Sequence, residues 1–270
     1  MRKFSPGSRH ILLAISVAML ATLHQAVFAQ RNNNRAASGP PKSAQESAPI
    51  DITGYWVSVV TEDWRFRMVT PKRGDYSNVP VTPEGKKIAD AWDPDKDIAD
   101  GMQCKAYGAP GVMRLPTRLH ITWQDASTLK IEADNGTQTR LIHVLGPQSV
   151  TYYAEGVAVK DVPATAPSWQ GNSVAEWEFS NGAKPAGGSL KVVTRNMLPG
   201  YLQKNGVPYG ANAVLTEYID RMSEPNGDTW LLDVSSIEDP EYLRTPFIHS
   251  THYKREPDGS KWDPSPCIAK

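Results

Sequence analysis

Three Asn-Gly dipeptides, each set between strand-like runs of residues, constrain the fold of this chain more than any other feature. They occupy residues 135–136, 181–182 and 226–227. Asn and Gly readily adopt the left-handed backbone conformation that tight turns between antiparallel strands require, so an Asn-Gly between two such runs is a strong signal of a β-hairpin. The three dipeptides therefore predict three hairpins and an antiparallel meander.

Further strand-like runs and one helical interlude complete the pattern. Thr82 followed by Pro83 favours a helix start, and we expect one short helical insertion near residues 83–102. About eight to ten strands without strand–helix alternation predict an all-β, mainly antiparallel fold, either a calycin- or lipocalin-like barrel or a strongly bent meander. Expected strands cover residues 52–60, 62–69, 119–124, 128–133, 139–144, 174–179, 190–195, 213–221, 229–236 and 247–254.

The N-terminus has the three parts of a secretory signal peptide. Three basic residues among the first nine precede an apolar run over residues 11–23, and Ala29 ends a short stretch of small residues. This order predicts removal of residues 1–29 by cleavage after Ala29 and a periplasmic or secreted mature protein. The apolar run is shorter than the ~20 residues of a membrane-spanning helix, so no stable membrane insertion is expected after cleavage.

The rest of the chain is expected to contain a linker and one domain. Residues 30–50 offer almost nothing to bury and predict a disordered linker, whereas residues 51–270 suffice for a single β-barrel domain. Cleavage would remove three of the 29 basic residues and none of the 29 acidic ones. Without a basic excess to neutralise phosphates, a nucleic-acid partner is not expected. The oligomeric state cannot be read from the sequence.

The chain contains two cysteines, Cys104 and Cys267. An exported chain meets an oxidising compartment, so we expect a disulfide between them. The alternative, a pair of free thiols with a redox or metal-binding role, has no support from the spacing of the two residues. We predict neither a metal site nor a cofactor.

The first expected strand contains a Gly-x-Trp motif, Gly54-Tyr55-Trp56. The motif resembles the first strand of lipocalins and other calycin barrels, where the Trp closes one end of the barrel beside a basic residue of the last strand. Lys254 or Arg255 could supply that basic partner. The alternative is that Trp56 is an ordinary core aromatic residue.

From Cys104 onward the chain also resembles a large group of uncharacterised secreted bacterial proteins rich in β-structure. No activity is attached to that group, so the resemblance implies export and a β-rich fold alone. Asn172 and residues 205–208 stand where histidines are common in the group, so a histidine-dependent function does not carry over. The resemblance rests, in order, on Cys104, 108–113, Pro116, Arg140, 167–178, 188–194, 205–209, 215–218, 238–240, 246–247 and Cys267.

One expected strand carries a carboxylate on its apolar face. Leu215, Glu217 and Ile219 alternate along the strand and share one face, which would point into a barrel. A bare buried charge is very costly, so Glu217 must be paired, hydrogen-bonded or shifted in pKa. Arg140 or Arg195 could pair with it. Two interpretations stay open: a dry ion pair, bidentate to arginine, or a site where Glu217 binds a ligand or acts as general acid/base.

The last expected strand supplies a second catalytic candidate, His249. His249 and His252 fall on opposite faces of that strand, which makes a shared metal site geometrically poor. A proton-transfer role for His249 beside Glu217 and a merely structural or solvated histidine are the alternatives.

Eight tryptophans and ten tyrosines give the remaining indication of function. Indole rings in a barrel can line a site for an aromatic, sterol-like or sugar ligand, and they fill a core equally well. The candidate ligand-binding residues are Trp56, Trp123, Arg140, Trp169, Trp177 and Tyr218.

These observations predict an exported β-barrel that binds a small apolar or aromatic molecule in its lumen. The first alternative is a secreted isomerase, lyase or hydrolase acting on such a molecule with Glu217 as acid/base, and the second is a structural or interaction protein of the cell envelope. The sequence does not decide whether the protein is an enzyme. Ser173 lacks the setting of a nucleophile elbow, and phosphate-binding and dinucleotide-binding glycine motifs are absent.

Overall fold

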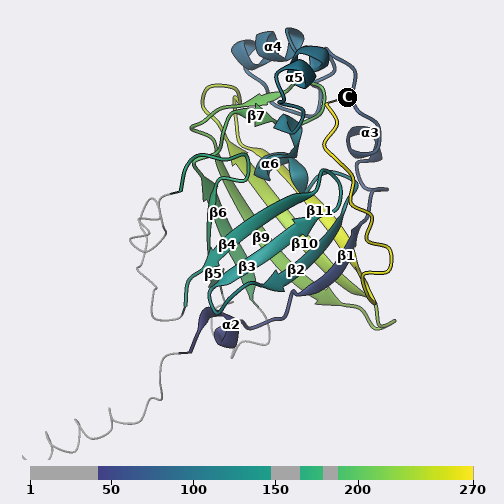
Figure 1. Cartoon of the computed structure of the whole chain (residues 1–270), viewed down its shortest axis with the longest axis vertical. Coiled ribbons are helices and arrows are strands. Elements are labelled where there is room, and N and C mark those ends of the chain that lie inside the picture. Colours follow the sequence, from purple (N-terminus) through teal and green to yellow (C-terminus); the bar gives the residue numbers. More distant parts are fainter. Residues whose placement is uncertain (1–41, 147–164, 179–187, 270) are drawn as a thin grey trace, which may run out of the picture. The chain divides into compact units, whose positions relative to one another are not determined.

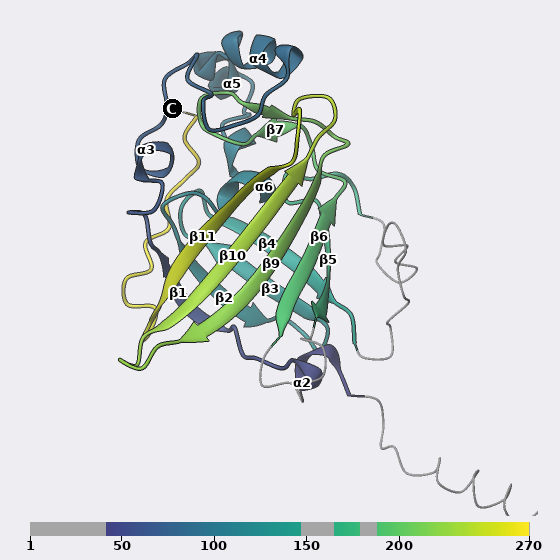
Figure 2. The ribbon, with the colours of Figure 1, turned by 180° about the vertical axis from the view of Figure 1, so that it is seen from behind.

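A computed structural model describes residues 42–146, 165–178 and 188–269, which contain a closed β-barrel with short helices at its ends (Figures 1 and 2). The barrel strands are β1 (Gly54–Ser58), β2 (Arg118–Trp123), β3 (Thr128–Ala133), β4 (Gln138–Val144), β5 (Asn172–Glu178), β6 (Ser189–Arg195), β9 (Val214–Ser223), β10 (Thr229–Glu238) and β11 (Phe247–Glu256). Around the ring they follow the order β1-β11-β10-β9-β6-β5-β4-β3-β2, and β1 closes it by pairing with β2. The predicted all-β class is confirmed.

Short elements cover the two ends of the barrel. At one end lies α2 (Ala44–Ser47), and at the other α4 and α5 stand beside the small sheet β7-β8 (Figure 1). The predicted helical insertion is present as α4 and α5, with Thr82 as the N-cap and Pro83 at the first helical position. Apart from α2, the short elements are α3 (Trp64–Arg67), α4 (Pro83–Asp90), α5 (Pro94–Ala99), the 3₁₀-helix η1 (Lys105–Tyr107), α6 (Ala109–Val112), β7 (Gly200–Tyr201) and β8 (Pro208–Tyr209).

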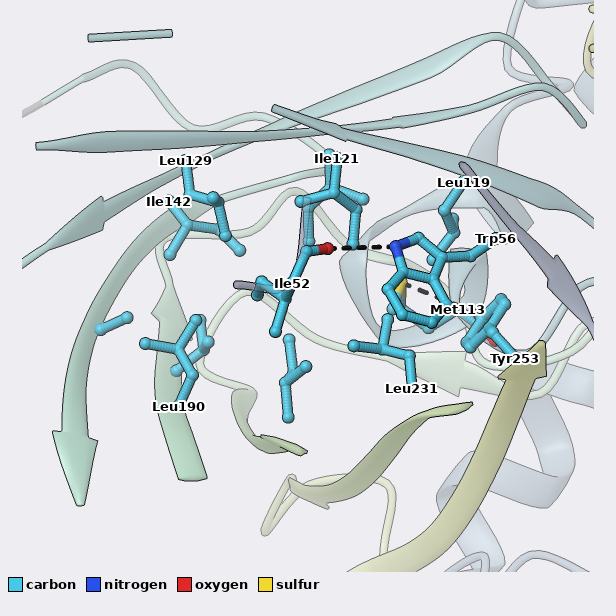
Figure 3. Close-up of a cluster of buried hydrophobic side chains, with 14 of the residues drawn as sticks. Ile52, Trp56, Met113, Leu119, Ile121, Leu129, Ile142, Leu190, Leu231 and Tyr253 are labelled. Atoms are coloured by element: carbon cyan, nitrogen blue, oxygen red, sulfur yellow. Dashed lines mark hydrogen bonds between the residues drawn. The ribbon is translucent and has the colours of Figure 1, made fainter. Parts of the chain in front are cut away.

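Two apolar clusters fill the described part of the interior. The larger one contains Trp56, whose Nε1 donates a hydrogen bond to the carbonyl oxygen of Ile52 at 3.0 Å (Figure 3). It also contains Ala44 of α2, so this short helix packs onto the same core. The second cluster joins Leu215 of β9 to residues of the helical end such as Ala89 of α4.

The predicted hairpins are present, although their turns are longer than two residues. Asn135-Gly136 lies in the four-residue connection of β3 and β4, whose outermost pair is Ala133 with Gln138. Gly136 and Gly227 both have positive φ, +84° and +89°. The turn that contains Gly227 joins β9 to β10. Strands β5 and β6 pair antiparallel as expected, but Asn181-Gly182 lies outside the described residues.

The strand expected over residues 62–69 is wrong, because this segment turns into α3. Asp63 adopts a left-handed conformation with φ +53°, and a helical turn follows. Arg67 points inward and donates to the carbonyl oxygens of Val59 and Arg114 at 2.8 and 3.0 Å, whereas Trp64 is 60% exposed. The alternation of apolar and polar residues was therefore misleading, since a buried arginine stabilises the segment.

Two further features differ from the expectation. The folded part was expected to begin at Asp51, whereas Ala44 is already buried in a helix whose N-cap Ser43 forms a capping box with Glu46. In addition, β4 and β5 pair in parallel. The parallel direction of this pair was not predicted, because the sequence that connects the two strands gives no signal of direction. The predicted signal peptide and the first residues of the predicted linker lie outside the described residues.

Cys104 and Cys267 form the predicted disulfide, with their Cα atoms 5.2 Å apart. The bond ties the C-terminal segment to the start of η1 across 163 residues of sequence. Within the described parts of the chain, no helix is long and apolar enough to cross a membrane.

Candidate functional site

A layer of polar side chains lies inside the barrel on the strands from β4 to β11. On β9, Glu217 stands between Leu215 and Ile219, which belong to the two different apolar clusters. The same interruption occurs on the neighbouring strands β10 and β11, where polar residues separate members of the two clusters. We call this set the polar layer: Arg140, Ser173, Thr194, Glu217, Asp233, Ser235, His249 and Thr251.

Arg140 and Glu217 form a bidentate ion pair at the centre of the polar layer. The Nη1 and Nη2 atoms of Arg140 donate to the two carboxylate oxygens of Glu217 at 2.8 and 2.6 Å, and both side chains are at most 1% exposed. Arg140 Nη2 also lies 3.4 Å from Thr194 Oγ1, which shares a 2.7 Å hydrogen bond with Ser173 Oγ. This is the dry, arginine-bound arrangement that a structural carboxylate requires.

Asp233 adds a second carboxyl group to the polar layer. It is fully buried, and burial, followed by the negative charge of Glu217, raises its pKa well above the ordinary value. Ser235 Oγ donates to its Oδ2 at 3.0 Å, while Oδ1 has no partner among the described residues. Because Arg140 is already paired with Glu217, we expect Asp233 to keep its proton to a higher pH than an exposed aspartate does.

His249 lies in the same row of the sheet as Glu217 but does not contact it. Ser235 pairs with Glu217 on one side and with His249 on the other. Two strand spacings of ~4.8 Å separate the backbones of Glu217 and His249. Among the described residues His249 Nδ1 has no hydrogen-bond partner, and the carboxylate of Glu217 is bound to Arg140. Burial, and then the charges of Arg114 and Arg67, lower the pKa of His249 well below its ordinary value, which favours a neutral imidazole. The acid/base role of this pair stays a prediction.

An open cavity of about 530 Å³ lies at the end of the barrel that carries α2. We call it the α2-end cavity. Its apolar side includes Pro49, Ile50 and Trp123, and Ile50 and Trp123 also pack against the larger apolar cluster. Its polar side includes Asp51, whose carboxylate accepts hydrogen bonds from the backbone N–H and the hydroxyl of Thr53. The remaining lining residues are Gln45, Ala48 and Thr122.

The other candidate ligand-binding residues do not share one site. Trp56 is fully buried in the core, where the guanidinium of Arg255 on β11 lies 5.4 Å from its ring. Trp177 packs against the larger cluster from the end of β5. Tyr218 alternates with the inward residues of β9 and lies on the outer face, while the carbonyl of Trp169 accepts from Ala109 at the helical end.

Sequence reasoning identified the ion pair but missed much of its surroundings. Thr194, Ser235 and Thr251 were not singled out, although each falls on an inward position of an expected strand. The α2-end cavity was missed because residues 45–50 were assigned to a disordered linker. The capping box Ser43-x-x-Glu46 was the available signal for order in that segment.

The described residues contain no group of three or more His, Cys, Asp or Glu side chains that could hold a metal ion. Comparisons of the chain with protein-family models, with curated proteins and with solved structures find no match.

Proposed function

We propose that the protein is an exported β-barrel that binds a small, largely apolar or aromatic molecule in the α2-end cavity. The observation that supports the proposal is the cavity itself. Its volume of about 530 Å³ falls within the range typical of small-molecule sites, and an indole, a proline and an isoleucine provide its apolar wall. The binding place thus differs from the expected one, at the mouth of the barrel instead of deep in the lumen.

The interior of the described barrel supports placing the ligand at this mouth. Trp56 and the aliphatic residues around it are fully buried and in mutual contact below the cavity. Farther in, both carboxylate oxygens of Glu217 accept hydrogen bonds from the Nη1 and Nη2 atoms of Arg140. A ligand that entered deeper would have to separate packed side chains or a buried ion pair, both of which cost several kcal/mol.

The lining also indicates the chemistry of the ligand. The face of an indole beside Pro49 and Ile50 suits a flat hydrocarbon or aromatic ring. Gln45, Thr53 and Thr122, which also line the cavity, offer amide and hydroxyl groups that can bind one polar substituent. Burial raises the pKa of Asp51, but the hydrogen bonds from Thr53 and the charges of Arg255 and Arg221 outweigh this effect and lower the pKa overall. Its carboxylate is therefore ionised and disfavours an anionic ligand.

A second cavity, of about 360 Å³, is the less suitable place. It lies beside β1 and the start of β2, and its lining includes Met68, Arg118 and Asp134 but no aromatic ring. An apolar ring would therefore find less favourable contact there than beside Trp123.

Export and family membership are part of the proposal. The signal-peptide pattern and the disulfide support a secreted or periplasmic protein, because disulfides persist in oxidising compartments. The Gly-x-Trp strand supports a protein of the lipocalin-like kind. Detection of a mature N-terminus at Gln30 in the exported fraction would test the predicted cleavage after Ala29. A full-length chain that stays inside the cell would contradict it.

Binding can be tested with the neutral fluorescent probe N-phenyl-1-naphthylamine. We expect saturable, one-to-one binding that Trp123→Ala weakens by at least tenfold, since the substitution removes the aromatic wall. Trp64→Ala is the matched control, because Trp64 is 60% exposed on α3 and does not line the cavity. Equal affinities of the two variants, with both folded by circular dichroism, would refute the site.

The enzymatic alternative makes a different prediction from the same chain. If Glu217 were a general acid/base, Glu217→Gln would abolish turnover of a substrate while probe binding in the α2-end cavity persisted. Perturbed buried carboxyls such as Asp233 are frequent at active sites, which is the observation that favours this alternative. For Glu217, the bidentate bond to Arg140 and the full burial of the side chain favour the structural interpretation.

A further inference from the structure

A third, smaller cavity lies beneath α3, where this helix meets the segment around α6 and the loop between β7 and β8. Its volume is about 30 Å³. A cavity of this size is large enough for one or two water-sized groups and too small for an organic ring. It is separate from the α2-end cavity and shares no lining residue with it.

Among the residues that the structure describes, three cationic side chains line this cavity and no acidic one does. They are Arg67, Arg114 and Lys204. Arg67 and Arg114 are both buried. Arg67 donates its hydrogen bonds to neutral acceptors, namely the carbonyl oxygens of Val59 and Arg114 and the hydroxyl of Ser58. Its positive charge is thus held by dipoles, without a carboxylate in contact.

Arg114 is only weakly neutralised from outside the cavity. Its Nη2 lies 3.4 Å from Asp63, and the side chain of Asp63 is 46% exposed. Burial, together with the like charge of Arg67, lowers the pKa of Arg114 to about 10, so it remains charged at neutral pH. The same two arginines help to lower the pKa of His249, consistent with an excess of positive charge around them.

Gln203 provides an independent indication that the cavity has an occupant. This lining residue is 5% exposed, and neither its Oε1 nor its Nε2 has a partner among the described residues. Each unsatisfied buried polar group costs about 1–3 kcal/mol, so a site that leaves both atoms unpaired is incomplete. A small group that accepts hydrogen bonds would satisfy the amide N–H of Gln203 and lie beside the guanidinium of Arg114, which also lines the cavity.

We propose that this cavity binds a small monovalent anion of about the size of chloride. An anion accepts hydrogen bonds from Arg114 and Gln203 and offsets the charge of two buried guanidiniums, which water alone does not. The small volume excludes sulfate and larger organic anions. The bound anion would fix α3 against the barrel at the point where Arg67 already anchors it.

Thermal unfolding at constant ionic strength tests the proposal, with sodium chloride replacing sodium gluconate. Binding to the folded state alone should raise the melting temperature by about 3–6 °C at ten times the dissociation constant. Arg114→Gln should abolish the increase. Arg65→Gln, on α3, is the matched control, because Arg65 is exposed and paired with Asp75, and it should retain the full response.

A crystal soaked in sodium bromide supplies a second readout that does not depend on the stability of the variants. We expect an anomalous peak between Arg114 and Gln203. A folded protein with no peak there would overturn the proposal. So would an equal response of the Arg114→Gln and Arg65→Gln variants, which would show general screening. Probe binding in the α2-end cavity should be unchanged in Arg114→Gln, so this test is independent of the proposed function.

Discussion

The ion pair between Arg140 and Glu217 allows the sharpest prediction about stability. Arg140→Met removes the cation and leaves Glu217 buried without its two guanidinium donors, while Glu217→Leu leaves the guanidinium unpaired. Because both side chains are at most 1% exposed, neither remaining charge can be hydrated without opening the barrel. Removing one partner of such a pair typically costs about 3–5 kcal/mol in the free energy of unfolding.

The double variant Arg140→Met/Glu217→Leu should be much more stable than the sum of the single changes implies. It replaces the pair by apolar side chains between two apolar clusters, an exchange that is often neutral or stabilising by about 1–4 kcal/mol. We therefore expect a coupling energy of several kcal/mol.

Urea unfolding followed by circular dichroism and tryptophan fluorescence measures these differences, with the disulfide intact in all four proteins. The m-value should stay constant across the series, so that changes of midpoint report stability. If either single variant loses less than about 1 kcal/mol, or if the two effects simply add, the charges are hydrated or paired elsewhere and our description of the polar layer is wrong.

Three other changes test separate parts of the structure. The raised pKa of Asp233 contributes stability that is fully present below the unfolded-state value of about 3.8 and is lost as pH rises toward the folded-state pKa. Asp233→Asn should flatten this decline in urea titrations from pH 4 to 7, and the variant should gain up to about 1.4 kcal/mol per pH unit relative to the wild type. Replacing Cys104 and Cys267 by serine should cost about 5 kcal/mol for a loop of 163 residues, and reduced wild-type protein should match the variant in guanidinium unfolding. Gly54→Ala should lower the melting temperature more than Gly74→Ala, since both have positive φ but only the former brings a new Cβ within 3.0 Å of a guanidinium nitrogen; equal losses would contradict a packing role.

The fold class could be predicted because local signals for strands and turns agree along most of the chain. The Asn-Gly turns and the alternation of inward and outward residues define β3-β4 and β9-β10 almost completely. The parallel pairing of β4 with β5 could not be predicted, since nothing local encodes the direction in which a strand returns to a sheet.

The candidate site was only partly predictable, for a related reason. Glu217 was conspicuous as a carboxylate between Leu215 and Ile219, but its choice of Arg140 over Arg195 depends on which strands face each other across the barrel. Arg67 was misplaced because a buried arginine that donates to backbone carbonyls has no periodic signature. The α2-end cavity combines residues before β1 with the end of β2, and only the closed ring brings these segments together.

A crystal structure of the protein with bound N-phenyl-1-naphthylamine tests the central claim most directly. We predict density for one probe molecule against the indole of Trp123, between Pro49 and Ile50 on one side and Thr122 on the other, with the Arg140–Glu217 ion pair unchanged in the barrel interior. Density for the probe beside Glu217, or only on another face of a protein with an empty α2-end cavity, would contradict the account.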